Sequence, residues 1–365
     1  MNKKIKTLIA VGGTGGHVFP GCNLARHLID RGYNVNLVTD KRGLKYLNKF
    51  KDIDFSVIPS SPIVKKNPVL FFISLMKIFF SILISFLYLI FNRPSIIFGM
   101  GGYASFPICV AASILRIRLI IYENNLVIGK ANKYLLPLAE KILVSCKDLD
   151  GVPIKYSKKT YEIGNIIKKE IINFSQIINE NIETNKLSIL ILGGSQAAKV
   201  FGEKLPYIFK DLSNENIPLK IYQHCLPSQN EALKDFYIKN NIDFETFNFS
   251  DNILDYFAKV NLAITRSGSS MLAELTNGNI PFISVPLPFS ADNHQLFNAR
   301  YYQKKKMAFT IQENDLQKNL QGLIKKIYRD INLLNEITNN QRQHSDKNVY
   351  DNIDKILKES FYEKN

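Results

Sequence analysis

The chain has 365 residues, which is enough for two domains of ordinary size, each with its own core. Its 46% hydrophobic and 22% charged residues exclude an intrinsically disordered protein. The net charge of +15 suits anionic partners, but no RNA-binding motif or arginine-rich stripe accompanies it, so we expect phosphorylated substrates or a membrane surface and no nucleic acid.

The first predicted element is a short strand at residues 5–11, followed by a glycine-rich loop, GGTGGHVFP, at residues 12–20. The strand is β-branched, apolar and too short for a secretory signal, so we expect the chain to stay in the cytosol. The glycines let main-chain N–H groups approach an anion, and a helix beginning near Val18 to Pro20 would direct its positive end at the same place. The pattern predicts a phosphate-binding loop; the alternative is a tight turn without a ligand.

The sequence lacks several other kinds of site. The loop has neither the G-x-G-x-x-G spacing of dinucleotide-binding loops nor the G-K-[ST] ending of ATP-binding loops. The four cysteines lie far apart without C-x-x-C spacing, which is typical of reduced thiols in a cytosolic protein. Asp52-x-Asp54 and Asp148-x-Asp150 match the D-x-D pattern of metal-using transferases, but neither follows a predicted strand, so we place both in surface loops.

The most apolar stretch of the chain lies at residues 68–91 and contains a single charge, Lys77. It is long enough to span a bilayer, but strands are predicted on both sides of it. Basic residues flank it at Lys65, Lys66 and Arg93. We therefore predict one or two helices with one face on the sheet and the other available to lipid. The alternative is a wholly buried pair of helices.

Apolar runs alternate with helical stretches along both halves of the chain, and LSILILGGSQAA at residues 187–198 repeats the strand and glycine loop. This rhythm predicts an α/β fold with two doubly wound parallel sheets. We divide the chain into an N-terminal domain at 1–163, a C-terminal domain at 164–337, and a C-terminal helix at 338–365 that packs back on the N-terminal domain. Ligands bind outside the carboxyl ends of such strands, so we expect both glycine loops to face a cleft between the domains.

The densest group of motifs lies at residues 265–299. A run of small residues, Ser267 to Ser270, follows an apolar strand and supplies hydroxyl and N–H groups suited to phosphate oxygens at a helix start. Glu274 would lie one turn into that helix, where its carboxylate can accept hydrogen bonds from ribose hydroxyls. The alternative for Glu274 is a solvated acid favoured by the helix dipole.

Six motifs in a fixed order carry a family resemblance over nearly the whole chain: GGTGGHVFP, FGMGGYASFP, YENN, GGSQAA, RSGSSMLAEL and PLPFSADNHQLFNA. In this order and spacing the chain resembles the MurG family of cell-wall N-acetylglucosaminyltransferases. The resemblance implies a GT-B fold and inverting transfer of N-acetylglucosamine from UDP-GlcNAc to the C4 hydroxyl of undecaprenyl-pyrophosphoryl-MurNAc-pentapeptide (lipid I), forming lipid II for peptidoglycan. It also implies peripheral attachment to the anionic cytoplasmic face of the bacterial inner membrane, without a cofactor or a metal.

The resemblance also assigns site residues. It places the donor site on Thr14, Gly15, Gly16, Asn125, Ser195, Ser269, Ser270, Met271, Leu272, Ala273, Glu274 and Gln295, with the uracil pocket around Ser250 to Ile253. His17 becomes the candidate general base or orienting group for the acceptor hydroxyl, because histidine titrates near neutral pH. The loop at residues 99–105 forms part of the acceptor pyrophosphate site.

The chain departs from the family pattern at the domain junction, where G-N-I-I-K at residues 164–168 replaces G-N-P-V-R. Lys168, the candidate diphosphate ligand there, is a point charge where the family has a guanidinium fork. GGSQAA and YENN depart more mildly. The alternatives are another GT-B nucleotide-sugar enzyme, such as a diacylglycerol glycosyltransferase or a UDP-GlcNAc 2-epimerase, and a non-catalytic membrane-binding partner. Retention of His17, Glu274 and Gln295 argues against the non-catalytic alternative.

Overall fold

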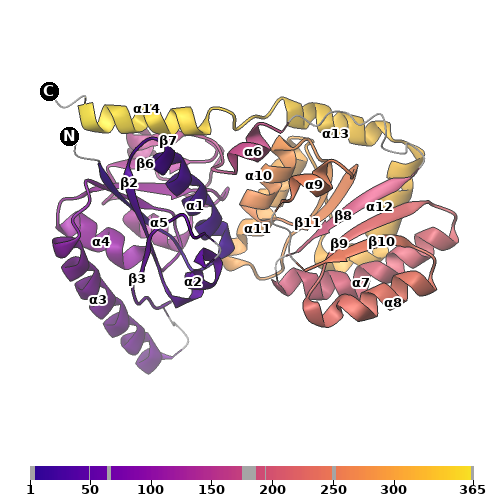
Figure 1. Ribbon diagram of the computed structural model, residues 1–365, viewed down its shortest axis with the longest axis horizontal. Coiled ribbons are helices and arrows are strands. Elements are labelled where there is room, and N and C mark those ends of the chain that lie inside the picture. The colour runs from indigo at the N-terminus through magenta and orange to yellow at the C-terminus, as the bar shows by residue number, and fades with distance from the viewer. Residues whose placement is uncertain are drawn as a thin grey trace. The chain divides into compact units, whose positions relative to one another are not determined.

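The computed structural model of the protein describes residues 5–48, 50–63, 67–174, 186–193, 195–248 and 252–362, without the side chains of 195–198 and 362. The chain forms two units, one of residues 1–167 with 346–365 and one of residues 168–345 (Figure 1). Each unit is a parallel β-sheet with helices packed on it. The predicted α/β fold with two doubly wound parallel sheets is therefore confirmed.

The sheet of the first unit has the strand order β3-β2-β1-β4-β5-β6-β7, and every pairing is parallel. The strands are β1 (Lys6–Ala10), β2 (Asn34–Thr39), β3 (Phe55–Val57), β4 (Ile96–Gly99), β5 (Arg118–Glu123), β6 (Lys141–Val144) and β7 (Thr160–Glu162). The order reverses at β1, which pairs with β2 on one side and β4 on the other. Ligands bind at such switch points, and the glycines of residues 12–16 and 101–102 follow β1 and β4 there.

The helices of the first unit are α1 (Gly15–Asp30), α2 (Lys41–Leu47), α3 (Pro68–Phe91), α4 (Phe106–Ile114), α5 (Lys130–Leu135), the 3₁₀ helix η1 (Ile154–Lys159) and α14 (Val349–Tyr362). The predicted start of the first helix near Val18 to Pro20 is wrong, because α1 already begins at Gly15. Thr14 is extended at the N-cap, and its carbonyl oxygen accepts hydrogen bonds from the N–H groups of His17 and Val18, both at 3.0 Å. Pro20 consequently lies inside the helix.

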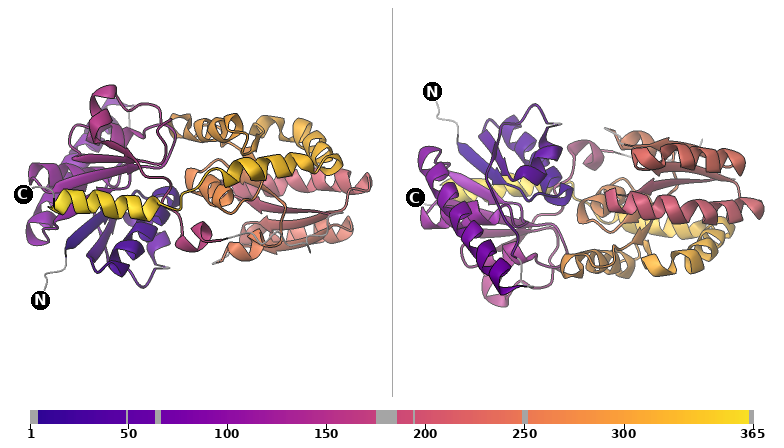
Figure 2. Two further views of the ribbon diagram at one scale, coloured as in Figure 1. Left: turned by 90° about the horizontal axis from the view of Figure 1, so that it is seen from above. Right: turned by 90° about the horizontal axis from the view of Figure 1, so that it is seen from below.

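Residues 68–91 form one continuous helix, α3, that lies along the outside of the first unit beside α4 (Figures 1 and 2). Its buried residues are Ser74, Ser81, Ser85 and Leu89. Most of the other apolar side chains are exposed, with 64% of Phe72 and 83% of Phe91 accessible. The alternative of a wholly buried helix pair is therefore wrong. The helix is long and apolar enough to cross a membrane by length and composition; its predicted flanks Lys65 and Lys66 lie outside the described residues.

The sheet of the second unit has the order β10-β9-β8-β11-β12-β13, again with parallel pairings. Its strands are β8 (Leu187–Leu192), β9 (Leu219–His224), β10 (Asp243–Phe247), β11 (Leu262–Arg266), β12 (Phe282–Val285) and β13 (Phe309–Thr310). The order reverses at β8, between β9 and β11. The motifs GGSQAA and RSGSSMLAEL thus lie at the carboxyl ends of the two strands that form this switch point.

The second unit has the helices α6 (Lys169–Ile172), α7 (Ser195–Asn214), α8 (Asn230–Lys239), α9 (Leu254–Phe257), α10 (Ser269–Asn277), α11 (His294–Lys304), α12 (Leu316–Arg329) and α13 (Asn332–Arg342). Short 3₁₀ helices occur at η2 (Pro227–Gln229), η3 (Ala291–Asn293) and η4 (Glu313–Asp315). Side chains from β8, β9 and β11 form its core with α7 and α12, and include Ile189, Ile221, Ile264, Phe209 and Leu320. This packing fixes the strand ends that carry the motifs.

The chain between β7 and α6 belongs to the first unit as far as Ile167, whereas the sequence places the boundary after residue 163. The Asp346 carboxylate accepts a hydrogen bond from the N–H of Asn165 at 2.8 Å, and the Tyr350 hydroxyl donates to the carbonyl of Ile167 at 2.6 Å. Gly164 has φ +94°, and a Cβ atom there would lie 2.6 Å from Asp346 Oδ1. Contacts between residues about 180 positions apart set this boundary, and they leave no local signal in the sequence.

The C-terminal helix α14 begins at Val349, since residues 338–342 still belong to α13 in the second unit. It packs on the first unit, along which it runs in Figures 1 and 2. Asp354 lies 2.8 Å from Nε2 of the buried His27 on α1, and Lys141 on β6 pairs with Glu359 at 3.2 Å. The last helix is therefore part of the first unit's fold.

Candidate active site

His17 lies between the two glycine loops at the switch point of the first unit. A Cβ atom at Gly12 would lie 2.8 Å from His17 Cδ2, and one at Gly101 would lie 3.1 Å from His17 Cε1. A Cβ atom at Gly102 would lie 2.8 Å from the Cα of Gly12. Gly101 and Gly102 also have positive φ angles of +85° and +77°. Only glycine permits this approach, so the two loops enclose the imidazole ring.

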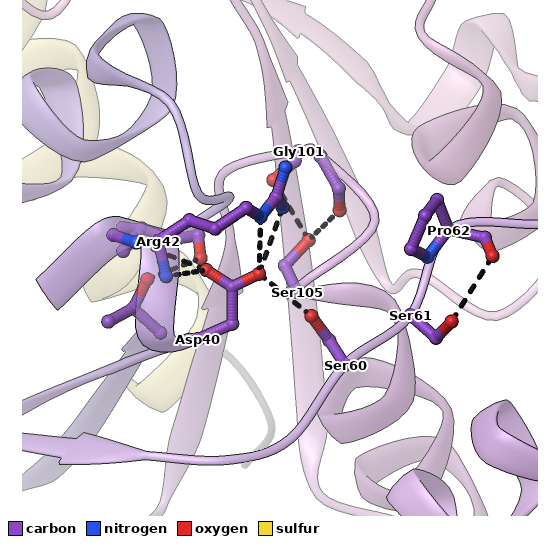
Figure 3. A network of polar contacts seen from close by, with 11 residues as sticks. Asp40, Arg42, Ser60, Ser61, Pro62, Gly101 and Ser105 are labelled. Atoms are coloured by element: carbon purple, nitrogen blue, oxygen red, sulfur yellow. Dashed lines mark hydrogen bonds and ion pairs between the residues drawn. The ribbon is translucent and has the colours of Figure 1, made fainter.

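The second loop is closed by Ser105, which precedes α4. Its hydroxyl donates to the carbonyl oxygens of Gly101 at 3.1 Å and Gly102 at 2.9 Å, as Figure 3 shows for Gly101. Ser105 is fully buried. These bonds hold the loop that contacts His17.

The YENN motif follows β5 and joins the same group. The buried carboxylate of Glu123 accepts hydrogen bonds from the N–H groups of Asn125 at 3.1 Å and Gly129 at 3.0 Å, and from Nδ2 of Asn132 at 2.9 Å. The side-chain amide of Asn125 also donates to Glu123, at 3.0 Å. Asn124 donates from Nδ2 to the carbonyl oxygen of Gly16 at 3.0 Å. Hydrogen bonds thus tie the third loop to the first.

The first unit therefore gathers five of the predicted site residues: Thr14, Gly15, Gly16, His17 and Asn125. The sequence interpretation assigned no role to three of the residues that hold them, Glu123, Asn124 and Asn132, and included Ser105 only as the end of the loop at residues 99–105. Asn132 lies in a helix without any local motif, and its role depends on the fold of β5 against α5. The YENN motif was the available signal for Glu123 and Asn124.

In the second unit, α10 begins at Ser269 after Gly268, as the small-residue run predicts. The Ser267 hydroxyl lies 2.7 Å from that of Ser284, and the carbonyl of Ser267 accepts a hydrogen bond from Asn298 Nδ2 at 3.0 Å. Gln295 accepts a hydrogen bond through Oε1 from the N–H of Leu287 at 2.9 Å. These bonds order the loops at the carboxyl ends of β11 and β12.

Glu274 lies on α10 and is partly buried. Burial raises the pKa of its carboxyl from 4.5 to about 7, and the positive charge of Lys168 opposes the rise. Lys168 immediately precedes α6, which packs beside α10. The lysine at the altered junction is thus an electrostatic neighbour of Glu274.

The remaining donor-site residues are only partly described. Met271, Leu272 and Ala273 lie in α10, and Leu272 and Ala273 are buried. Ile253 stands at the N-cap of α9, and its carbonyl accepts from the N–H groups of Tyr256 and Phe257. The Ser195 side chain and the whole of Ser250 lie outside the described residues.

A buried arginine at the end of β11 was also missed by the sequence interpretation. Arg266 pairs with Glu313, and its guanidinium lies 4.9 Å from the centroid of the Phe201 ring. It directly precedes Ser267 in the predicted motif. In the described part of the chain, no group of three or more His, Cys, Asp or Glu side chains could hold a metal ion.

Two parallel sheets, each with small-residue loops at its switch point, are typical of the GT-B fold of nucleotide-sugar enzymes. The N-terminal domain of glycosyltransferase family 28 matches residues 7–144, and the C-terminal domain of that family matches residues 188–354. The chain therefore belongs to glycosyltransferase family 28.

Individual relatives agree with this assignment. The UDP-N-acetylglucosamine–N-acetylmuramyl-(pentapeptide) pyrophosphoryl-undecaprenol N-acetylglucosamine transferase of Pelagibacter ubique is 33% identical over 356 residues, 97% of each chain. The enzyme of that name from Rickettsia felis is 35% identical and covers 85% of this chain and 87% of its own. The crystal structure of Acinetobacter baumannii MurG has a TM-score of 0.77 at 25% identity, over 98% of this chain and 100% of its own. The resemblance to the MurG family is confirmed.

The fold is shared more widely. The structure of MnaA from S. aureus with UDP has a TM-score of 0.65 at 15% identity, over 98% of this chain and 96% of its own. This similarity concerns the fold alone.

Proposed function

We propose that this protein transfers N-acetylglucosamine from UDP-GlcNAc to the C4 hydroxyl of lipid I and forms lipid II, with inversion at the anomeric carbon. The observation that carries the proposal is the enclosure of His17 by the glycine loops of the first unit, in a chain similar to N-acetylglucosamine transferases over 97% of its length. The acceptor and the nucleotide of the donor are assigned to different units.

The first unit binds the lipid-linked acceptor. The glycine loops at residues 12–16 and 101–102 present main-chain N–H groups, and the N-terminus of α1 adds a partial positive charge for the diphosphate. His17 takes the proton from the acceptor hydroxyl as that oxygen attacks the anomeric carbon of the donor sugar. Its tight packing between the loops supports a fixed position for the base.

The second unit binds the donor. The N-termini of α7 and α10 face the charge that develops on the departing UDP, which supports leaving-group stabilisation without a metal. Glu274 accepts hydrogen bonds from the ribose hydroxyls, and Lys168 favours the ionised form of that carboxylate. Ser195, Ser250, Ile253, Ser269 to Ala273 and Gln295 complete the second unit's share of the donor residues. The family resemblance also assigns Thr14, Gly15, Gly16 and Asn125 of the first unit to the donor.

The protein attaches peripherally to the anionic cytoplasmic face of the inner membrane through α3. Its exposed apolar side chains include Val69, Leu70, Phe72, Phe79, Phe80, Leu83, Leu87 and Phe91. The face of α3 that carries Ser74, Ser81 and Ser85 packs against the first unit. The exposed apolar side chains therefore do not pack into the core of that unit. An amphipathic position in the membrane interface would bury this surface and bring the first unit close to its lipid-linked acceptor.

The test is transfer from radiolabelled UDP-GlcNAc by the purified full chain, with and without a lipid I analogue. We expect label in the lipid product and release of UDP only when the acceptor is present. Turnover of UDP-GlcNAc without an acceptor would instead indicate an epimerase or hydrolase. Donor binding without any turnover would indicate a non-catalytic protein.

A further inference from the structure

Asp40 and Arg42 form a charged pair (Figure 3). The pair lies beside Gly13 of the first glycine loop in the first unit. Asp40 follows β2 and is only 7% exposed. Its Oδ1 accepts hydrogen bonds from the N–H groups of Arg42 and Gly43, both at 3.1 Å. Its Oδ2 accepts from Arg42 Nε and from the hydroxyl of Ser60, both at 2.9 Å. The carboxylate therefore fixes one edge of the Arg42 guanidinium.

The negative charge of Asp40 is well satisfied by these donors. Burial acts to raise the pKa of Asp40, but the hydrogen bonds from Arg42, Gly43 and Ser60 outweigh it and lower the pKa below its ordinary value. Asp40 is thus ionised near neutral pH. The carboxylate accepts hydrogen bonds from two backbone N–H groups and a hydroxyl, in addition to its ion pair with the Arg42 side chain.

The guanidinium of Arg42 lies between both glycine loops. Its Cζ atom is 3.9 Å from the centroid of the Tyr103 ring, and Tyr103 directly follows Gly102. A Cβ atom at Gly13 would lie 2.6 Å from Nη2 of Arg42, so the guanidinium also rests on the backbone of the first loop. The Arg42 side chain nevertheless remains 44% exposed.

A guanidinium carries five N–H donors in a planar fork that matches phosphate oxygens. Asp40 engages Nε and Nη2, which leaves the other edge of the fork to a ligand. We propose that Arg42, oriented by Asp40 and Tyr103, binds the diphosphate of the lipid-linked acceptor in the first unit. This inference rests on the proposed function, because it names a binding residue for the acceptor of that reaction.

The location of Lys168 supports this assignment. The sequence nominates Lys168 as a diphosphate ligand, but its charged neighbour in the second unit is Glu274. Arg42 belongs to the same unit as His17 and contacts both loops that enclose it.

The test compares two acceptors with the full-length wild type, Arg42→Ala and Arg42→Lys. One acceptor carries the natural diphosphate, and in the other an uncharged linker of equal length replaces it. Acceptor binding without donor and kcat/KM for transfer are both measured. We expect Arg42→Ala to weaken binding and lower kcat/KM for the diphosphate acceptor about 10- to 100-fold, the usual effect of losing a charge-assisted hydrogen bond. We expect less than about a twofold change with the uncharged acceptor.

Equal losses with both acceptors would overturn the proposal, because they would show that Arg42 only holds the loops. No loss with the diphosphate acceptor would overturn it as well. Arg42→Lys keeps the charge without the fork and should lose part of the preference for the diphosphate. If Arg42→Ala does not fold, the comparison of the two acceptors with Arg42→Lys tests the proposal instead.

Arg26→Ala is the matched control. Arg26 also pairs with a carboxylate, Asp52, at 2.7 Å and also lies over an aromatic ring, Phe50. We expect Arg26→Ala to change neither the binding nor the kcat/KM of either acceptor.

If the wild type binds the diphosphate acceptor but transfers nothing, the proposed function fails. The comparison of acceptor binding then still supports or overturns the role of Arg42.

Discussion

Asn124 donates a hydrogen bond from Nδ2 to the carbonyl oxygen of Gly16 at 3.0 Å. Pro20 stands four residues after Gly16 inside α1 and has no N–H group, so it cannot supply the donor that an α-helix normally directs to that carbonyl. The side chain of Asn124 replaces the missing donor. The bond joins the loop after β5 to the first glycine loop.

Replacing Asn124 with alanine should lower the free energy of unfolding by about 1 to 2 kcal/mol, because the hydrogen bond from the buried Asn124 side chain to the Gly16 carbonyl is lost. In a Pro20→Ala background the helix regains an N–H for Gly16, so the same Asn124→Ala change should cost less. Chemical denaturation of the four proteins measures this coupling. Equal costs in both backgrounds would show that Pro20 is unrelated to the role of Asn124.

His17→Ala should reduce kcat for transfer about 10²- to 10⁴-fold, because the acceptor hydroxyl loses its general base. The KM for UDP-GlcNAc should change little, since the nucleotide of the donor is assigned to the second unit. Initial rates at varied donor and acceptor concentrations separate the two parameters. His344→Ala serves as a control, since that half-buried histidine follows α13 and lies outside all six site motifs. Near-normal turnover by His17→Ala would remove His17 from the mechanism.

Titration of Glu274 should lower the free energy of unfolding as pH rises from about 4.5 to 7. Its folded-state pKa is raised to about 7, so in this interval the folded protein holds a proton that the unfolded chain releases. The expected loss is on the order of 2 kcal/mol, since one pKa unit corresponds to about 1.4 kcal/mol and partial exposure screens part of the shift.

Denaturation of wild type and Glu274→Gln at several pH values measures this effect. The stability difference between them should change in favour of the glutamine variant as pH rises through that interval, and then level off above it. Glu203→Gln, at an exposed position on α7, should show no such trend. A constant difference between wild type and Glu274→Gln would contradict the raised pKa.

The double substitution Phe72→Ser with Phe79→Ser should weaken binding to vesicles containing anionic phospholipid at least about tenfold. Full burial of each phenylalanine contributes about 1.5 to 3 kcal/mol, and both side chains are largely exposed on α3. Co-sedimentation with vesicles measures the effect. The matched control is Ile238→Ser on α8 of the second unit, where the isoleucine is 65% exposed. Equal vesicle binding by the double variant would show that α3 is not the attachment surface.

The sequence alone predicted the two parallel sheets, both small-residue loops and the apolar segment that became α3. These features depend on short stretches of chain, such as a buried β-branched run at residues 5–11 or the glycines that follow it. Such local patterns restrict the backbone whatever surrounds them. For this reason the group around His17 could be nominated before its geometry was known.

Only the tertiary structure decided which side chains hold that group. Asn124 bonds to Gly16 across 108 positions, and Asp346 to Asn165 across 181. Arg42 meets Tyr103 only because β2 and β4 lie on either side of β1. Such partners depend on strand order and on how adjacent loops pack. A buried polar group requires a donor or acceptor, but its sequence neighbours do not reveal which distant residue supplies one.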